Sequence, residues 1–296
     1  ISFVLILFVI GIGLYFYESS NLFYITICAI PFIILIIFED IYQNINPILR
    51  LLGIFLSTIF YFTFIYKSLP SVDIQFFGNI INLPIINVIF FSLALTGYMN
   101  GLNFVDGTNG LAACTLLATA ISLLFLCLKF NDLELAYLLI LFISLIVSFL
   151  VLNFPYGKIF LGDSGAYFSA WVLGILTVQL MDRHPEILSW NAVCVLSYPV
   201  IELIFSFFRK IINKQNPFYP DDKHLHLKLY FVLNEKIENK MIANSLVTPI
   251  LSLIWLTPLI LIPWTYDDRN LVIFAIIFQI IIYFLFYNYI PYRRPK

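Results

Sequence analysis

Long apolar runs restrict what this chain can fold into more than any other feature of its sequence. A helix of about 20 mostly apolar residues is long enough to cross the hydrocarbon core of a bilayer. Lipid offers no partner to a free backbone N–H or C=O, so a run that enters it is expected to be helical. We find ten such runs, at 1–17, 22–38, 51–66, 83–100, 110–129, 135–152, 165–181, 190–208, 245–264 and 271–290.

The composition agrees with a membrane protein rather than with a water-soluble one. Hydrophobic residues make up 61% of the chain and charged residues 11%, against roughly 45–50% and about 25% in soluble domains. The net charge of -1 argues against a nucleic acid as partner, because phosphate binding needs clustered Lys and Arg. We therefore predict an all-α fold, a polytopic transmembrane helix bundle of about ten spans, forming one transmembrane domain over residues 1–296.

The first run differs from the others. The chain opens with Ile1, and residues 1–17 form a short run without the basic segment and the cleavage site of a signal peptide. We interpret the sequence as truncated at its N-terminus, with one span missing ahead of Ile1.

Lys and Arg residues gather on one side of the predicted topology. With ten alternating spans, loops 39–50, 101–109, 153–164 and 209–244 and the tail 291–296 share a side, which carries 12 of the 16 Lys and Arg residues. The positive-inside rule places that side in the cytoplasm. The longest polar stretch, 209–244, is then a cytoplasmic loop.

Four polar clusters interrupt the apolar background, and all four fall on this predicted cytoplasmic side. Two of them are acidic. Glu39 and Asp40 are adjacent at a predicted membrane boundary, where they can bind a divalent cation or accept a proton, or simply form a solvated helix end. Asp163 follows Lys158 and stands where a helix begins, which suits either a Mg²⁺ ligand or an N-cap.

The third cluster is rich in amides. The segment from Asn100 to Gly110 packs three Asn, one Asp and three Gly between two apolar runs. Glycine permits a close backbone approach, and Asn103, Asp106 and Asn109 can hold a phosphate-bound metal or sugar hydroxyls. An ordinary polar turn needs only two or three such residues, so we favour a substrate-binding segment.

The fourth cluster lies in loop 209–244 and holds two of the three His residues of the chain, His224 and His226. A histidine can donate to a phosphate or act as a general acid. A zinc site is less favoured, because no Cys or third His lies nearby in the sequence. Glu202, inside the run 190–208, fits either the bundle interior or a shifted boundary, and we leave it out of the predicted site.

Together these clusters resemble the motifs of the polyprenyl-phosphate N-acetylhexosamine-1-phosphate transferase family. That family includes undecaprenyl-phosphate GlcNAc-1-phosphate transferase and phospho-MurNAc-pentapeptide translocase. The resemblance covers nearly the whole chain, with four motifs in the family's order. The matching residues are Glu39-Asp40 with Pro47 and Arg50 for the acidic pair, Asn103, Asp106 and Asn109 for NxxDGxDG, Asp163 for GD(S/T/A)G, and His224 and His226 for HxHH.

The chain departs from these motifs at three positions. Glu39 replaces the first Asp of the acidic pair, Asn109 replaces the second Asp of NxxDGxDG, and Leu227 replaces the last His of HxHH. The resulting HLHL sequence is unlike the three-His run of the peptidoglycan translocase branch. It is closer to the GlcNAc-type transferases of O-antigen, teichoic acid and capsule pathways. A PRGGG-like motif of the family, ahead of Ile1, is also missing.

The resemblance implies an enzyme that moves N-acetylhexosamine-1-phosphate from a UDP-sugar to undecaprenyl phosphate and releases UMP. UDP-GlcNAc is the first candidate donor, and the site would face the cytoplasm of a bacterial inner membrane. Mg²⁺, or Mn²⁺ in its place, would be the cofactor, and a homodimer is compatible. The implied roles are catalytic for Glu39, Asp40, Asp106 and Asp163, metal-binding for Asp163 and Asn103, and substrate-binding for Asn103, Asn109, Lys158, His224 and His226.

A secondary transporter is the chief alternative from another functional class, since transporters also have about ten spans and polar residues within them. Their binding sites lie near the membrane midplane, at broken helices within inverted repeats. Here the polar clusters lie in predicted loops and the sequence shows no repeat. A purely structural membrane subunit would leave the Asn-rich segment and the paired histidines unexplained.

Overall fold

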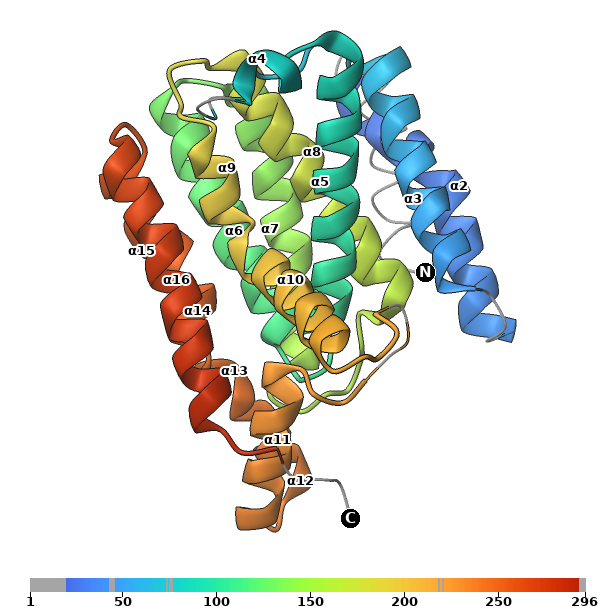
Figure 1. Cartoon of the computed structure of the whole chain (residues 1–296), viewed down its shortest axis with the longest axis vertical. Helices are drawn as coiled ribbons and strands as arrows, with labels where there is room; N and C mark the ends of the chain where they lie inside the picture. The colour runs from blue at the N-terminus through green and yellow to red at the C-terminus, as the bar shows by residue number, and fades with distance from the viewer. Residues whose placement is uncertain are drawn as a thin grey trace. The chain divides into compact units, whose positions relative to one another are not determined.

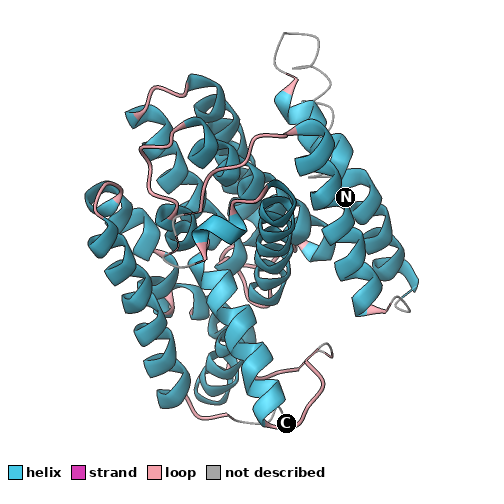
Figure 2. Ribbon diagram, turned by 45° about the horizontal axis from the view of Figure 1, so that its top comes forward, coloured by secondary structure: helices cyan, strands magenta, loops and turns pink. Residues whose placement is uncertain are grey.

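The computed structural model describes residues 20–42, 46–72, 74, 77–217, 219 and 221–292, so the predicted span 1–17 lies outside the described residues. Throughout the described part of the chain every regular element is a helix, which confirms the predicted all-α class (Figure 2). The chain divides into two compact units, unit 1 (Ile1–Asn100 with Leu161–Ser189) and unit 2 (Gly101–Phe160 with Trp190–Lys296). The single transmembrane domain stays a prediction.

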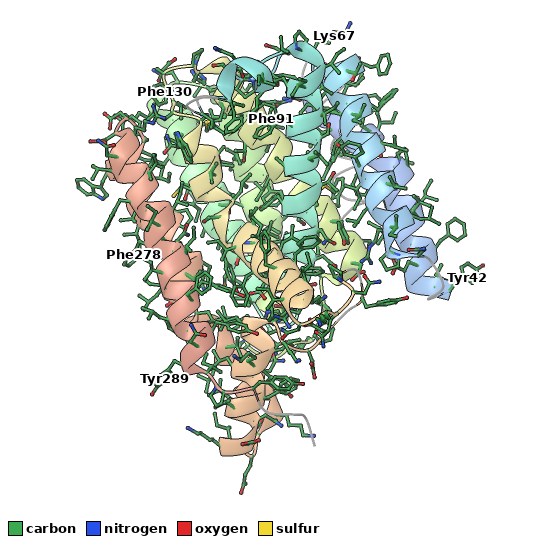
Figure 3. The ribbon with its side chains drawn as sticks, in the orientation of Figure 1. Tyr42, Lys67, Phe91, Phe130, Phe278 and Tyr289 are labelled. Atoms are coloured by element: carbon green, nitrogen blue, oxygen red, sulfur yellow. The ribbon has the colours of Figure 1, made fainter. Side chains whose placement is uncertain are left out.

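Unit 1 is built around a buried helix, α8. The side chains of α8 are buried from Ser164 to Met181, and the ring of Trp171 packs 5.3 Å from that of Phe32 on α2, centroid to centroid. Helices α2 and α3 run side by side, with Tyr42 and Lys67 at opposite ends of the pair (Figures 1 and 3). The helices of this unit are α2 (Asn21–Tyr42), α3 (Pro47–Phe60), its π-helical continuation η1 (Tyr61–Ile65), α4 (Gly78–Ile81), α5 (Pro84–Val105) as far as Asn100, and α8 (Gly162–Arg183).

Within the described residues, unit 2 contains the last residues of α5 and ten further helices. Helix α6 packs against α7 and α15, and α15 packs against α16. Phe130 and Tyr289, which follow α6 and end α16, lie at opposite ends of this unit (Figure 3). Its helices are α6 (Leu111–Lys129), α7 (Leu133–Asn153), α9 (Trp190–Val195), α10 (Ser197–Ile212), α11 (Leu225–Lys236), α12 (Lys240–Ser245), α13 (Val247–Ile250), α14 (Ser252–Trp255), α15 (Thr257–Thr265) and α16 (Arg269–Tyr289).

In the described part of the chain, eight helical segments are long and apolar enough to cross a membrane. They correspond to eight of the nine runs predicted between residues 22 and 290, and the chain is an integral membrane protein. The segments are Asn21–Glu39, Pro47–Ile65, Pro84–Val105, Leu111–Lys129, Leu133–Asn153, Gly162–Arg183, Lys240–Thr265 and Arg269–Tyr289.

The remaining run, 190–208, differs from the prediction because it is two helices, α9 and α10, rather than one. The reason is Pro199, which has no N–H to donate to the carbonyl of Val195 four residues earlier. The hydroxyl of Thr119 on α6 donates to that carbonyl instead, at 2.9 Å. A side chain from a neighbouring helix therefore satisfies the backbone group that the proline leaves open.

A side-chain donor also satisfies a carbonyl that a proline leaves open in the segmented span Lys240–Thr265. Pro258 cannot donate to the carbonyl of Ile254, and the side-chain amide of Gln279 on α16 donates to that oxygen at 3.1 Å. The amide oxygen of Gln279 in turn accepts from the hydroxyl of Ser197 on α10. One buried amide thus links α10, α14 and α16 at the point where the span is interrupted.

Removal of the Thr119 hydroxyl tests this account of the proline break. Thr119→Val is expected to lower the free energy of unfolding by about 1–2 kcal/mol, because the buried carbonyl of Val195 loses its donor. Thr115→Val is the matched control, since the Thr115 hydroxyl donates within its own helix, to the carbonyl of Leu111 at 2.8 Å. Thermal unfolding in detergent measures both variants, and equal losses in the two would contradict the assignment.

Candidate active site

Two acidic residues of unit 1, Glu39 and Asp163, both contact a single arginine, Arg50. Nη1 of Arg50 lies 3.0 Å from Oε2 of Glu39 and 3.1 Å from Oδ2 of Asp163. Glu39 comes from the last turns of α2, Arg50 from the first turn of α3 and Asp163 from the first turn of α8. Two predicted site residues 124 positions apart in the sequence are therefore brought together by a third residue.

Local sequence explains where these three side chains are presented. Pro47 occupies the first turn of α3, and the side chain of Asn46 caps that helix by accepting from the N–H of Ile48 at 2.9 Å. The cap fixes the start of α3, so Arg50 falls one turn inside it. At α8 the N-cap position belongs to Leu161 rather than to Asp163, and the carboxylate of Asp163 is directed to Arg50 instead of capping its own helix.

Arg50 also connects the acidic cluster to α5. Its guanidinium carbon lies 5.4 Å from the ring centroid of Tyr167, a cation–π distance. The hydroxyl of Tyr167, which is fully buried, donates to Oδ1 of Asn100 at 2.8 Å. The sequence alone places Arg50 near the acidic pair but does not indicate which residues it contacts. Asp40 follows Glu39 in α2, and its side chain lies outside the described part of the structure.

The Asn-rich segment belongs to unit 2 from Gly101 onward, and its last asparagine is held by the protein itself. The side-chain amide of Asn109 donates to the carbonyl of Pro155 at 3.0 Å and to the hydroxyl of Ser245 at 3.3 Å. Its backbone N–H donates to Oδ1 of Asn244 at 2.7 Å. The structure therefore shows Asn109 shaping the loop, and a contact with substrate stays a prediction for this residue.

Asn103, Asp106 and Lys158 differ from Asn109 in exposure. Asn103, on the last turn of α5, and Asp106, just after it, are half-buried. Lys158 is exposed, with its ammonium 5.6 Å from the ring centroid of Tyr156. These three side chains are partly accessible to a ligand, which is compatible with the catalytic role predicted for Asp106 and the substrate-binding roles predicted for Asn103 and Lys158.

The first histidine of the loop, His224, contacts a buried carboxylate. Nδ1 of His224 lies 2.9 Å from Oε1 of Glu202, a residue that is 1% exposed. On the other side of the ring, Nε2 lies 3.8 Å from Oδ1 of Asp221. The predicted site does not include Glu202, although an ionisable residue within an apolar run is by itself a signal of function.

The second histidine, His226, is in a different environment. It is 1% exposed, and burial lowers its pKa from the ordinary 6.5 to about 4, so the ring is neutral at physiological pH. A Cβ at Gly107 would come within 2.3 Å of its Nε2. Glycine at this position therefore lets the loop after Asp106 pack directly on the imidazole.

A cationic group surrounds Asp221, ahead of the histidines. Nη2 of Arg209 donates to both carboxylate oxygens of Asp221, at 3.1 and 2.9 Å, and Nζ of Lys210 lies 3.6 Å from Oδ2. The backbone N–H of Lys223 donates to Oδ1 at 2.9 Å. Burial opposes ionisation of Asp221, but this hydrogen bond and the neighbouring cations outweigh it and lower the pKa of the carboxyl.

Comparisons with known proteins find relatives over most of this chain. A family model described as glycosyl transferase family 4 matches residues 22–181. Undecaprenyl-phosphate alpha-N-acetylglucosaminyl 1-phosphate transferase of Thermotoga maritima is 30% identical over 217 residues, covering 73% of this chain and 64% of the relative. Phospho-N-acetylmuramoyl-pentapeptide-transferase of the same organism is 28% identical over 200 residues, covering 67% and 64%.

A third relative is matched over a shorter stretch. The probable undecaprenyl-phosphate N-acetylglucosaminyl 1-phosphate transferase of Bacillus subtilis is 29% identical over 138 residues, covering 46% of this chain and 38% of the relative. The chain thus spans between 38% and 64% of the length of these three relatives.

The environment of His226 predicts a pH dependence of stability. Its pKa is lower in the folded chain than the ordinary 6.5, so protons bind the unfolded chain more tightly. The stability that depends on the neutral ring is complete above pH 6.5 and is lost as pH falls toward 4, by up to about 3 kcal/mol. His226→Gln is expected to remove this part of the pH dependence of thermal unfolding in detergent. An unchanged pH profile would contradict the neutral, buried ring.

Proposed function

This chain belongs to glycosyl transferase family 4, and we propose on that premise that it transfers N-acetylhexosamine-1-phosphate from a UDP-sugar to undecaprenyl phosphate, releasing UMP. UDP-GlcNAc is the first candidate donor, because two of the three relatives described are named as N-acetylglucosaminyl 1-phosphate transferases. The lipid-linked product would start a cell-surface glycan of the O-antigen, teichoic acid or capsule type.

The observation that carries this proposal is the pairing of Glu39 and Asp163 on Arg50. The proposed reaction joins two anions, a lipid phosphate and the β-phosphate of a nucleotide sugar. Their repulsion has to be offset by cations that are already in position. A cluster with two carboxylates and one guanidinium offers oxygen ligands for a metal and a fixed positive charge in one place.

The donor set of unit 1 fits Mg²⁺. This ion favours oxygen ligands and is commonly held by one or two carboxylates together with substrate phosphates. Among the described residues no group of three or more His, Cys, Asp or Glu side chains is gathered for a metal, which suits an ion that takes its other ligands from substrate and water. We propose that Asp163 holds the ion; bound there, Mg²⁺ or Mn²⁺ would neutralise phosphate charge. The role of Asn103 as a metal ligand stays a prediction from the sequence.

The remaining roles are assigned by the chemistry of each side chain. Glu39 or Asp40 accepts a proton from the lipid phosphate or orients it. Asp106, with Asn103, positions the nucleotide sugar, and Asn109 supports their loop through the hydrogen bonds described above. Lys158 and His224 contact phosphate oxygens, and His226, whose ring stacks on that of His224, supports the loop.

We also propose the location of the reaction. Most Lys and Arg residues flank the ends of the spans that carry these clusters, which favours the cytoplasmic face of a bacterial inner membrane. UDP-sugars are water-soluble and a polyprenyl phosphate carries its charge at the bilayer surface, so the two substrates meet at such a face. Assembly as a homodimer is compatible with the proposal and is tested by the mass of the purified protein in detergent.

A carboxylate exchange at Asp163 tests the proposed function. Membranes holding the full-length protein are incubated with undecaprenyl phosphate, Mg²⁺ and a panel of UDP-sugars, and UMP is followed. Asp163→Asn is expected to reduce UMP release about 100-fold or more, because the ion loses its charged ligand. Asp182→Asn is the matched control on the same helix. Its carboxylate accepts from the hydroxyls of Tyr66 and Ser68 at 2.7 and 2.8 Å, and turnover should stay within about threefold of the wild type.

Two outcomes would contradict the proposal. One is near-normal UMP release by Asp163→Asn with the fold intact. The other is uptake of a solute into proteoliposomes without UMP release from any donor, which would favour the transporter alternative.

A second variant pair tests the charge of Arg50. Both carboxylate contacts are made by one nitrogen, Nη1, so a single ammonium can replace it. Arg50→Lys is expected to retain most of the UMP release, whereas Arg50→Gln should lose about tenfold or more, because two carboxylates are left without their cation. Equal activity of the two variants would show that the positive charge is not required.

A further inference from the structure

Glu202 is the most deeply buried carboxylate among the described residues that surround the histidine loop, and all its hydrogen bonds come from that loop or from α16. Oε1 lies 2.9 Å from Nδ1 of His224 and accepts from the backbone N–H of Leu225 at 3.3 Å. Oε2 accepts from the hydroxyl of Tyr283 at 2.9 Å. These three hydrogen bonds compensate for the burial of the carboxylate.

This arrangement determines the tautomer of His224. An ionised carboxylate can only accept hydrogen bonds, so Nδ1 of His224 has to carry the proton that lies between them. In the neutral ring Nε2 is then an acceptor, and in the charged ring it is a second donor. Glu202 therefore selects Nε2 as the atom with which His224 meets any ligand.

A further contact holds the plane of the ring. The ring of Phe104, on the last turn of α5, lies 4.9 Å from the imidazole, centroid to centroid. Asp221 lies beyond Nε2, at 3.8 Å, and its charge is already paired with Arg209. At 3.8 Å Nε2 is too far for a hydrogen bond to Asp221, so this atom keeps its capacity for another partner.

His226 has no such support within the described part of the chain. Its Nδ1 is buried without a hydrogen-bond partner, and its Nε2 packs against Gly107. The two histidines of the HLHL sequence are therefore chemically different. His224 has one nitrogen fixed by a carboxylate, whereas His226 is a neutral ring packed against backbone.

We propose that Glu202 is a positioning residue, which keeps a proton on Nδ1 of His224, so that Nε2 faces the nucleotide sugar and, when the ring is protonated, donates to a phosphate oxygen. The proposal rests on the proposed function for the identity of the ligand, but not for the orientation of the ring. Glu202 touches no substrate in this account. Its effect reaches the reaction only through His224, and His226 serves as packing for the loop.

The tautomer is measured directly on the full-length protein with ¹⁵N-labelled histidine in detergent micelles. The chain has three His residues, so replacement of each by Gln assigns the three imidazole signals. Above the pH at which the ring becomes neutral, the protonated nitrogen of His224 is expected to be Nδ1 in the wild type. In Glu202→Gln the neutral amide can either accept from Nδ1–H or donate to Nδ1, so the preference for Nδ1 should weaken and the Nε2–H form should appear. A wild-type ring protonated at Nε2 would overturn the proposal, whether or not any variant folds.

Kinetics separate positioning from a merely structural role. Glu202→Gln is expected to lower kcat for UMP release about 10- to 100-fold with KM for the UDP-sugar changed less than about threefold, the range seen when an outer partner of a functional His is removed. Glu235→Gln, the same exchange at an exposed position of α11, is the control for the chemical change alone.

A double variant completes the test. If Glu202 acts through His224, then Glu202→Gln in a His224→Gln background should cost no further activity. Additive losses would show that Glu202 acts elsewhere, and an unchanged kcat in Glu202→Gln would contradict the positioning role. Absence of UMP release from the wild type with every donor would instead count against the proposed function, while the tautomer measurement would still decide the role of Glu202.

Discussion

Every backbone carbonyl that enters lipid needs a donor from within the protein, and the helices of this chain depend on that constraint. Its effect is clearest at the prolines. Thr119 donates to the carbonyl that Pro199 leaves open, and Gln279 does the same for the carbonyl opposite Pro258. These contacts let helices be interrupted inside apolar sequence without leaving a polar group unpaired. Buried polar side chains of unit 2 thus contribute to its fold together with its apolar side chains.

Charged side chains, like the backbone carbonyls, find their partners within the protein. In a chain with 11% charged residues, the acidic and basic side chains described above lie in compact groups, within which they contact one another. In unit 1, Arg50 holds Glu39 and Asp163. In unit 2, Arg209 holds Asp221 while Glu202 holds His224. Each group combines acidic and basic atoms at short distances, which reduces the cost of keeping charged side chains in a largely apolar protein.

Much of this could be predicted from the sequence, and the part that could not has a physical reason. Eight of the ten predicted apolar runs correspond to long apolar helical segments, because lipid leaves the backbone no alternative. The break at Pro199 was missed because hydropathy does not register a missing N–H. The roles of Arg50 and Glu202 could not be predicted, because they depend on contacts with residues far away in the sequence. These residues are Asp163 and His224, respectively. The motif that contains Asn109 was recognised, but a motif cannot show that its side chain is occupied by Pro155 and Ser245.

The central claim is that a phosphate, and not only a sugar, passes to the lipid. It is tested most directly with UDP-GlcNAc that carries ³²P in the β-phosphate, incubated with undecaprenyl phosphate and membranes holding the protein. Transfer of the sugar-1-phosphate breaks the bond between the two phosphates, so the label should appear in the organic-solvent extract while unlabelled UMP is released. Label that stays in the aqueous phase as UDP, with the sugar alone on the lipid, would contradict the account.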